Sequence, residues 1–144
     1  MSQHVLVPVD GSPQAEQALE YVLDEMPGSK ITLVHVFNPA RSFGYGEDEY
    51  FDFEAYQAEV DRAHDRAEEL LDEYRETATE RGFEVETLLT TGKPARQILE
   101  AVESEGVDHV VMGSRGRSGL GRVLFGSVAE AVTRRASVPV TIIR

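Results

Sequence analysis

Short apolar runs alternate with longer amphipathic stretches along the chain, and this alternation restricts the fold more than any other feature of the sequence. The apolar runs are rich in β-branched residues, which is typical of buried strands. The stretches between them repeat apolar residues every three or four positions, which is typical of helices. The predicted strands are Val5–Val9, Ile31–Val36, Phe83–Leu88, Val107–Met112 and Pro139–Ile143.

Four helices are predicted between these strands. The first begins at Ser12–Pro13, a cap followed by a first-turn proline, and stops at Pro27–Gly28. The second is long and acidic and ends at Gly82, and the others cover 94–105 and about 126–135. The apolar face expected for the long helix consists of Phe53, Tyr56, Val60, Ala63, Ala67, Leu70, Tyr74 and Ala78.

Strict alternation of strands and helices predicts an α/β fold, because each parallel step between strands needs a crossover. We expect one domain over residues 1–144, with a five-stranded, mostly parallel sheet in the order 3-2-1-4-5 and helices on both faces, a Rossmann-like arrangement of the adenine nucleotide alpha hydrolase type. Pro8 fits poorly, since proline removes a ladder hydrogen bond from a central strand. It lies close to the strand end, where pairing can already be weaker.

The composition excludes several classes of function. The 144 residues include no cysteine, which rules out disulfides, thiolate catalysis and cysteine metal sites. The formal net charge of −12 argues against binding of nucleic acid or of an anionic membrane by the general surface. No apolar run approaches the roughly 20 residues that span a bilayer, and the first residues lack a signal-peptide pattern. We therefore expect a cytoplasmic protein.

A glycine-rich segment follows the fourth predicted strand. It runs from Gly113 to Ser127 and contains five glycines, which let main-chain N–H groups approach an anion closely. Three arginines lie in it, and no acidic residue occurs between His109 and Ala129. The helix that begins near Gly126 adds free amides and its dipole. The segment therefore predicts an anion site, with a flexible surface loop as the simpler alternative.

Asp10 is expected to lie beside this segment. Ligands of open α/β sheets bind beyond the carboxyl ends of the strands, where the strand order reverses. In the order 3-2-1-4-5, strands one and four are neighbours there, which brings Asp10 next to Gly113. A carboxylate at this point suits ribose hydroxyls or a metal ion on phosphates. The alternative is that Asp10 only stabilises the turn that it begins.

The glycine segment resembles the ATP-binding signature of the universal stress protein family. The pattern is Gly113-x-x-Gly116, nine residues, and then Gly126-Ser127. The resemblance covers essentially the whole chain and includes four further stretches: Val7-Pro8-Val9-Asp10-Gly11-Ser12, His35-Val36, Gly92-Lys93-Pro94 and Val138-Pro139-Val140.

The resemblance implies a binding site for ATP with a divalent cation, Mg²⁺ or Mn²⁺, among the phosphates. The main chain of Val36 would contact the adenine, and Asp10 and Gly113 would bind the ribose. The residues implied for the phosphates are Gly116, Gly126, Ser127 and Val128. Pro8, Met112 and Arg115 complete the predicted nucleotide site. No catalytic residue and no metal ligand is assigned.

Two classes of function remain open: a nucleotide-dependent regulatory or stress-response protein, and a slow ATPase or nucleotidyl-transfer enzyme. The segment lacks the lysine that clamps a transferring phosphate in P-loop proteins. Arg115, Arg117 or Arg122 could stabilise developing charge, but no general base is evident beyond Asp10. A receiver-type signalling domain is rejected, because the third strand leads into Thr90-Thr91-Gly92 rather than an aspartate. A flavin-binding module is an outside alternative.

The last strand predicts a partner. Val138–Ile143 is apolar on both faces and is expected to form a sheet edge, which would need a cover. The resemblance implies a homodimer built through this strand. Four histidines occur, and none has metal-ligand spacing to another. Of these, His35 and His109 lie in strand runs and are expected to be packed core groups.

Overall fold

The computed structural model describes residues 3–37, 52–114 and 126–144. In these ranges five strands form one sheet in the order β3-β2-β1-β4-β5, and every ladder is parallel. The predicted α/β class and strand order are confirmed. The strands are β1 (His4–Pro8), β2 (Lys30–Phe37), β3 (Glu84–Thr91), β4 (His109–Gly113) and β5 (Val140–Ile143).

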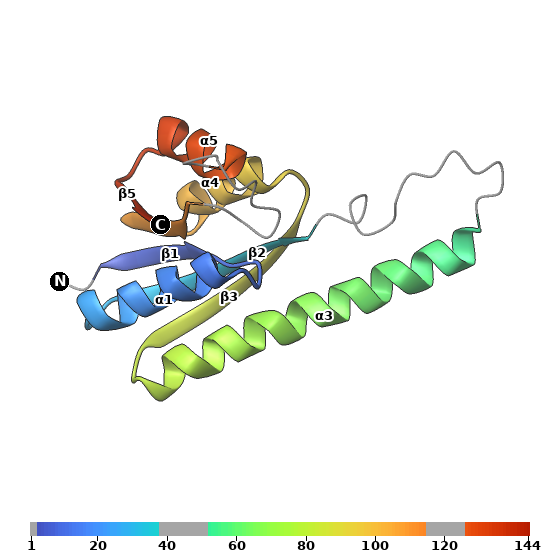
Figure 1. Cartoon of the computed structure of the whole chain (residues 1–144), viewed down its shortest axis with the longest axis horizontal. Helices are drawn as coiled ribbons and strands as arrows, with labels where there is room; N and C mark the ends of the chain where they lie inside the picture. The colour runs from blue at the N-terminus through green and yellow to red at the C-terminus, as the bar shows by residue number, and fades with distance from the viewer. Residues whose placement is uncertain (1–2, 38–51, 115–125) are drawn as a thin grey trace.

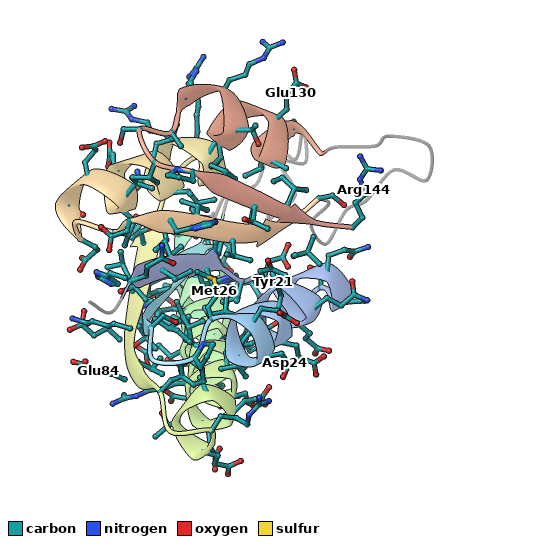
Figure 2. The ribbon with its side chains drawn as sticks, turned by 90° about the vertical axis from the view of Figure 1, so that its left-hand side faces the viewer. Tyr21, Asp24, Met26, Glu84, Glu130 and Arg144 are labelled. Carbon is teal, nitrogen blue, oxygen red and sulfur yellow. The ribbon has the colours of Figure 1, made fainter. Side chains whose placement is uncertain are left out.

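Helices cover both faces of the sheet (Figures 1 and 2). One apolar core joins the sheet to α1 and α3, and the other joins it to α4 and α5. Side chains of a strand alternate between the two cores: Val5 and Val7 face α1 and α3, whereas Leu6 faces α4 and α5. The helices are α1 (Pro13–Glu25), α3 (Phe53–Glu80), α4 (Pro94–Ser104) and α5 (Ser127–Arg135).

Pro8 is accommodated at the end of β1. It pairs in register with Val34 of β2, and the next residue, Val9, donates its N–H to the Val34 carbonyl at 2.9 Å. Because main-chain groups alternate in direction along a strand, the Pro8 nitrogen faces β4 rather than β2. The β1–β4 pairs are Val5 with His109 and Leu6 with Val110, so Pro8 lies beyond them. The proline therefore leaves the β1–β2 ladder intact, and the β1–β4 ladder ends before it.

β3 is longer than predicted. The sequence pattern ended this strand at Leu88, but β3 pairs with β2 as far as Thr91, which lies opposite Phe37. Of the extra residues, Leu89 and Thr90 are only partly buried and Thr91 is exposed, so their apolar pattern is weak. Main-chain pairing to the long strand β2 keeps them extended. β3 forms one edge of the sheet, as predicted, and β5 forms the other.

The predicted apolar face of α3 is correct only for its C-terminal part. Ala63, Ala67, Tyr74 and Ala78 are buried as expected, but Phe53 is 67% exposed. Figure 1 shows why: the N-terminal part of α3 reaches past the carboxyl edge of the sheet. No helix in the described ranges combines the length and apolar character that crossing a membrane requires.

Candidate functional site

The β1–α1 turn fixes Asp10 at the carboxyl edge of the sheet. Asp10 Oδ1 accepts a hydrogen bond from the Ser12 N–H at 3.0 Å, and Ser12 Oγ caps α1 by accepting from the Ala15 N–H at 3.2 Å. Gly11 between them has φ of 83°, a backbone conformation that favours glycine. The turn-stabilising role considered for Asp10 is therefore present, and it also fixes the direction of the carboxylate.

The end of β4 lies against the start of α1. A β-carbon at Gly113 would clash with Gln14 in the first turn of α1, so the two elements approach as closely as glycine allows. Since β1 and β4 are neighbouring parallel strands, the turn that carries Asp10 lies beside Gly113. The expected pairing of β1 with β4 is observed, and it brings the carboxyl ends of these two strands together.

The start of α5 is held at the same place. Gly126 donates its N–H to the Ser114 carbonyl at 2.6 Å, and Ser114 donates its own N–H to the Ile143 carbonyl at 2.8 Å. Gly126 is the N-cap of α5 and provides no side-chain cap. The first amides of a helix have no partner inside the helix, so those of Ser127 and Val128 are suited to an anion. Arg115 and Gly116 lie outside the described residues.

The main chain of Val36 lies beyond the end of β1. Val34 faces β1, because its carbonyl accepts from the Val9 N–H. Residues two apart along a strand point the same way, so the N–H and C=O of Val36 also face the β1 side. The Val9 carbonyl is taken by His35 Nδ1, which donates to it at 2.7 Å. A ligand edge beside Val36 would therefore meet a donor and an acceptor of the main chain.

An apolar wall lies between these polar groups. Val36 and Met112 belong to the core that faces α4 and α5, and Met112 is only 5% exposed. Val128 of α5 packs into the same core. Pro8 follows Leu6 by two residues and is directed to the same face. The described members of the predicted nucleotide site thus gather at one edge of the sheet.

Tyr74 of α3 was not recognised as part of this region from the sequence. Its side chain packs in the core on the α1 side, and Leu70, one turn earlier, lies beside Gly11. Burial, and then the negative charges of Glu16 and Asp10, raise the pKa of Tyr74 to about 12. The phenol thus lies in the electric field of the Asp10 carboxylate, and a helical 3.6-residue repeat alone could not reveal this.

The two strand histidines are packed groups, as expected. His35 holds the end of β1 through Val9, and His109 Nε2 forms a hydrogen bond of 2.7 Å with Thr141 Oγ1 of β5. Both side chains are partly buried. Burial lowers the pKa of His109. Their contacts give each ring a structural role in joining neighbouring strands.

Two other features lie apart from the predicted residues. His64, Asp65 and Glu68 form an exposed cluster on α3, with ligand atoms within 4.8 Å of one another. A surface groove of about 870 Å³ follows α4 and is lined by acidic side chains, basic side chains and the apolar Leu99. Its charged residues include Arg96 and Glu100, which pair at 3.4 Å.

The whole chain matches one known protein family. The family described as the universal stress protein family matches residues 1–144. The chain belongs to the universal stress protein family. The family membership predicted from the sequence is confirmed. Universal stress protein YxiE of Bacillus subtilis is 30% identical, with the whole length of both chains covered.

Solved structures share the fold of this universal stress protein. The structure of MJ0577, a universal stress protein of Methanocaldococcus jannaschii, has a TM-score of 0.84 and 27% identity, over 99% of this chain and 96% of that one. A family member from Arabidopsis thaliana was solved with AMP bound, with a TM-score of 0.70, 22% identity and 98% and 90% of the chains covered. Another was solved in complex with cAMP, with a TM-score of 0.66, 22% identity and 99% and 97% covered.

Proposed function

We propose that this universal stress protein binds ATP at the carboxyl edge of its sheet and acts, as one domain over residues 1–144, as a nucleotide-dependent regulatory protein of the cytoplasm. One observation carries the proposal: the Asp10 turn and the uncapped start of α5 lie on either side of the end of β4. A carboxylate and helix N-terminal amides in this arrangement would suit the ribose and the phosphates of a nucleotide.

Each part of ATP has a counterpart in this arrangement. The main chain of Val36 offers a donor and an acceptor to the adenine edge, and Pro8 and Met112 offer apolar surface to its ring. Asp10 and the Gly113 main chain would hold the ribose. The phosphates would lie on the amides of Ser127 and Val128, beside Gly126, whose own N–H is already donated to the Ser114 carbonyl. Arg115 and Gly116 would be further contacts, with Mg²⁺ or Mn²⁺ among the phosphates. The AMP and cAMP complexes of the two related structures support a nucleotide at this fold.

The described residues favour binding over catalysis. Among the described residues of the predicted site, Asp10 is the acidic one, and its Oδ1 already accepts from the Ser12 N–H. A general base must instead reach the proton that it removes. Regulation by occupancy needs no such group, and so slow hydrolysis is the secondary hypothesis.

ATP binding is tested by isothermal titration calorimetry of two variants at one position. Gly126 has φ of −69°, which other residues adopt, so Gly126→Glu and Gly126→Gln differ mainly in charge. The carboxylate should weaken ATP binding roughly tenfold or more relative to the amide, since like charges a few ångströms apart repel by about 1–4 kcal/mol. Equal affinity of both variants and the wild type would contradict the site.

A homodimer through Val138–Ile143 is the second part of the proposal. β5 is an edge strand whose residues are all partly buried, and an apolar edge of this kind needs a cover. Antiparallel pairing of two copies about a twofold axis would cover both. Arg144, at the end of this strand, is visible at the edge of the sheet in Figure 2.

The edge-strand dimer is tested by sedimentation of variants at Ile142. The Pro139 and Ile143 carbonyls accept hydrogen bonds from the β4 side, so the N–H of Ile142 faces away from β4. Ile142→Pro removes this outward donor, and Ile142→Val keeps it. At micromolar concentration the wild type and Ile142→Val should sediment as dimers and Ile142→Pro as a monomer. A monomeric wild type would refute the dimer.

A further inference from the structure

Two side-chain hydroxyls in the described part of the chain are buried without a hydrogen-bond partner at normal geometry, and both lie near the proposed nucleotide site. They are Tyr74 Oη and Thr90 Oγ1. Tyr74 lies near the Asp10 turn on the α1 side, and Thr90 lies opposite Val36 in the β2–β3 ladder. Buried polar groups are nearly always paired in folded proteins, so an unpaired one needs an explanation.

Thr90 lies on the same face of the sheet as the apolar wall of the proposed site. Val36 and Leu88 both pack into the core that faces α4 and α5. Thr90 is two residues after Leu88 on β3 and is the register partner of Val36, so its side chain is directed to that face. It therefore adds a single hydroxyl to a wall otherwise formed by Pro8, Val36 and Met112.

Two other threonines of the sheet have partners that Thr90 lacks. Thr32 Oγ1 forms a hydrogen bond of 2.7 Å with His4 Nε2, and Thr141 Oγ1 forms one of 2.7 Å with His109 Nε2. In both cases the partner histidine lies on the adjacent strand. The adjacent residue for Thr90 is Val36, which has no polar side-chain atom.

The start of α4 does not supply the missing partner. Pro94 is the first residue of this helix and has no N–H to donate. The helix cap, Lys93, makes no side-chain capping bond. The hydroxyl of Thr90 thus remains unpaired at the carboxyl edge of the sheet. At the same edge, the main-chain groups of Val36 face the β1 side just beyond the end of β1.

We propose that the Thr90 hydroxyl forms a hydrogen bond with the base of the bound nucleotide and so helps to select ligands that carry a heteroaromatic base. The inference rests on the proposed ATP site. A hydroxyl both donates and accepts, and rotation about one side-chain bond re-aims it. Together with the N–H and C=O of Val36, Thr90 would make a third polar contact to the base edge, while phosphates bound at α5 would not involve it.

The test compares ATP with inorganic tripolyphosphate, which has phosphates but no base, by calorimetry. Thr90→Val keeps the shape of the side chain and removes the hydroxyl. It should raise the Kd for ATP roughly 5- to 10-fold, the effect of losing one hydrogen bond. The Kd for tripolyphosphate should not change. Thr90→Ser, which keeps the hydroxyl, should bind ATP nearly as well as the wild type.

Thr91→Val is the matched control. Thr91 is exposed and adjacent on the same strand, so its side chain points to the opposite face and its loss should leave ATP binding unchanged. Unchanged ATP affinity in Thr90→Val would overturn the inference, as would an equal weakening of ATP and tripolyphosphate. A wild type that binds no ATP would instead refute the proposed function, and the role of Thr90 with it.

Discussion

Gly113 and Gln14 lie so close together that a β-carbon on Gly113 would stand 2.6 Å from the Gln14 β-carbon and 3.0 Å from its carbonyl carbon. The first glycine of the predicted ATP-binding signature therefore has a packing role of its own. It lets the first turn of α1 contact the end of β4, and α1 in turn fixes the position of the Asp10 turn. A residue expected to serve the ligand also assembles the edge on which the ligand would lie.

Gly113→Ala is predicted to lower the free energy of unfolding by about 1–3 kcal/mol, the usual effect of overpacking a close contact. The backbone of Gln14 lies within the clash, so a side-chain rotation alone cannot relieve it. The measurement is urea denaturation followed by circular dichroism.

A second variant separates this clash from other effects of the alanine. Gln14→Gly removes the β-carbon at 2.6 Å, so Gly113→Ala should be less destabilising in that background. The double-mutant cycle should therefore show a favourable coupling between the two substitutions. Strictly additive effects would mean that the contact with Gln14 is not the cause.

The order of the elements could be predicted from the sequence because each buried strand and helix face has its own local apolar period. The prediction that Asp10 and Gly113 lie at the ends of neighbouring strands needed only the strand order. The burial of Phe53 was wrongly predicted, because a helical repeat does not reveal where the sheet beneath it ends. The close contact of Gly113 with Gln14 and the unpaired hydroxyl of Thr90 depend on residues far apart in the sequence, which local patterns do not contain.

Ser12→Ala is predicted to destabilise the protein by about 1 kcal/mol, because it removes the side-chain cap of α1. Ser12 is buried, so in the variant water cannot easily reach the Ala15 N–H and accept its hydrogen bond in place of the lost hydroxyl. Thermal unfolding should show a lower Tm. Ser104→Ala, at the exposed end of α4, is the control and should change stability by less than about 0.5 kcal/mol. Equal effects at both positions would contradict the capping role.

His109 is predicted to make the protein less stable as the pH falls below about 6.5. Burial lowers the pKa of this imidazole in the folded state, while the unfolded state keeps the ordinary value of 6.5. The unfolded state therefore binds a proton first, so this contribution to stability is present above pH 6.5 and is lost as the pH falls through the folded pKa. The urea midpoint should decrease between pH 7.5 and 5.5, and less so in His109→Gln. An unchanged pH dependence in the variant would assign it to other groups.

Tyr74 is predicted to limit stability at the alkaline end. Its pKa is raised from 10.0 to about 12 in the folded state, mainly by burial, so the unfolded phenol loses its proton first. Stability is thus fully present below pH 10 and falls as the pH rises toward 12.

Tyr74→Phe should reduce this alkaline loss in urea unfolding measured between pH 9 and 11. It also removes a buried hydroxyl whose polar neighbour, the Gly11 main chain, is not at normal hydrogen-bond geometry, so the variant should be about as stable as the wild type at neutral pH. Tyr21→Phe is the matched control, because Tyr21 is 38% exposed on α1, and it should leave the alkaline loss unchanged. If Tyr74→Phe loses stability at neutral pH, the hydroxyl must form a stabilising hydrogen bond with water or protein in solution. If the variant keeps the full alkaline loss, the phenol of Tyr74 ionises normally in the folded state.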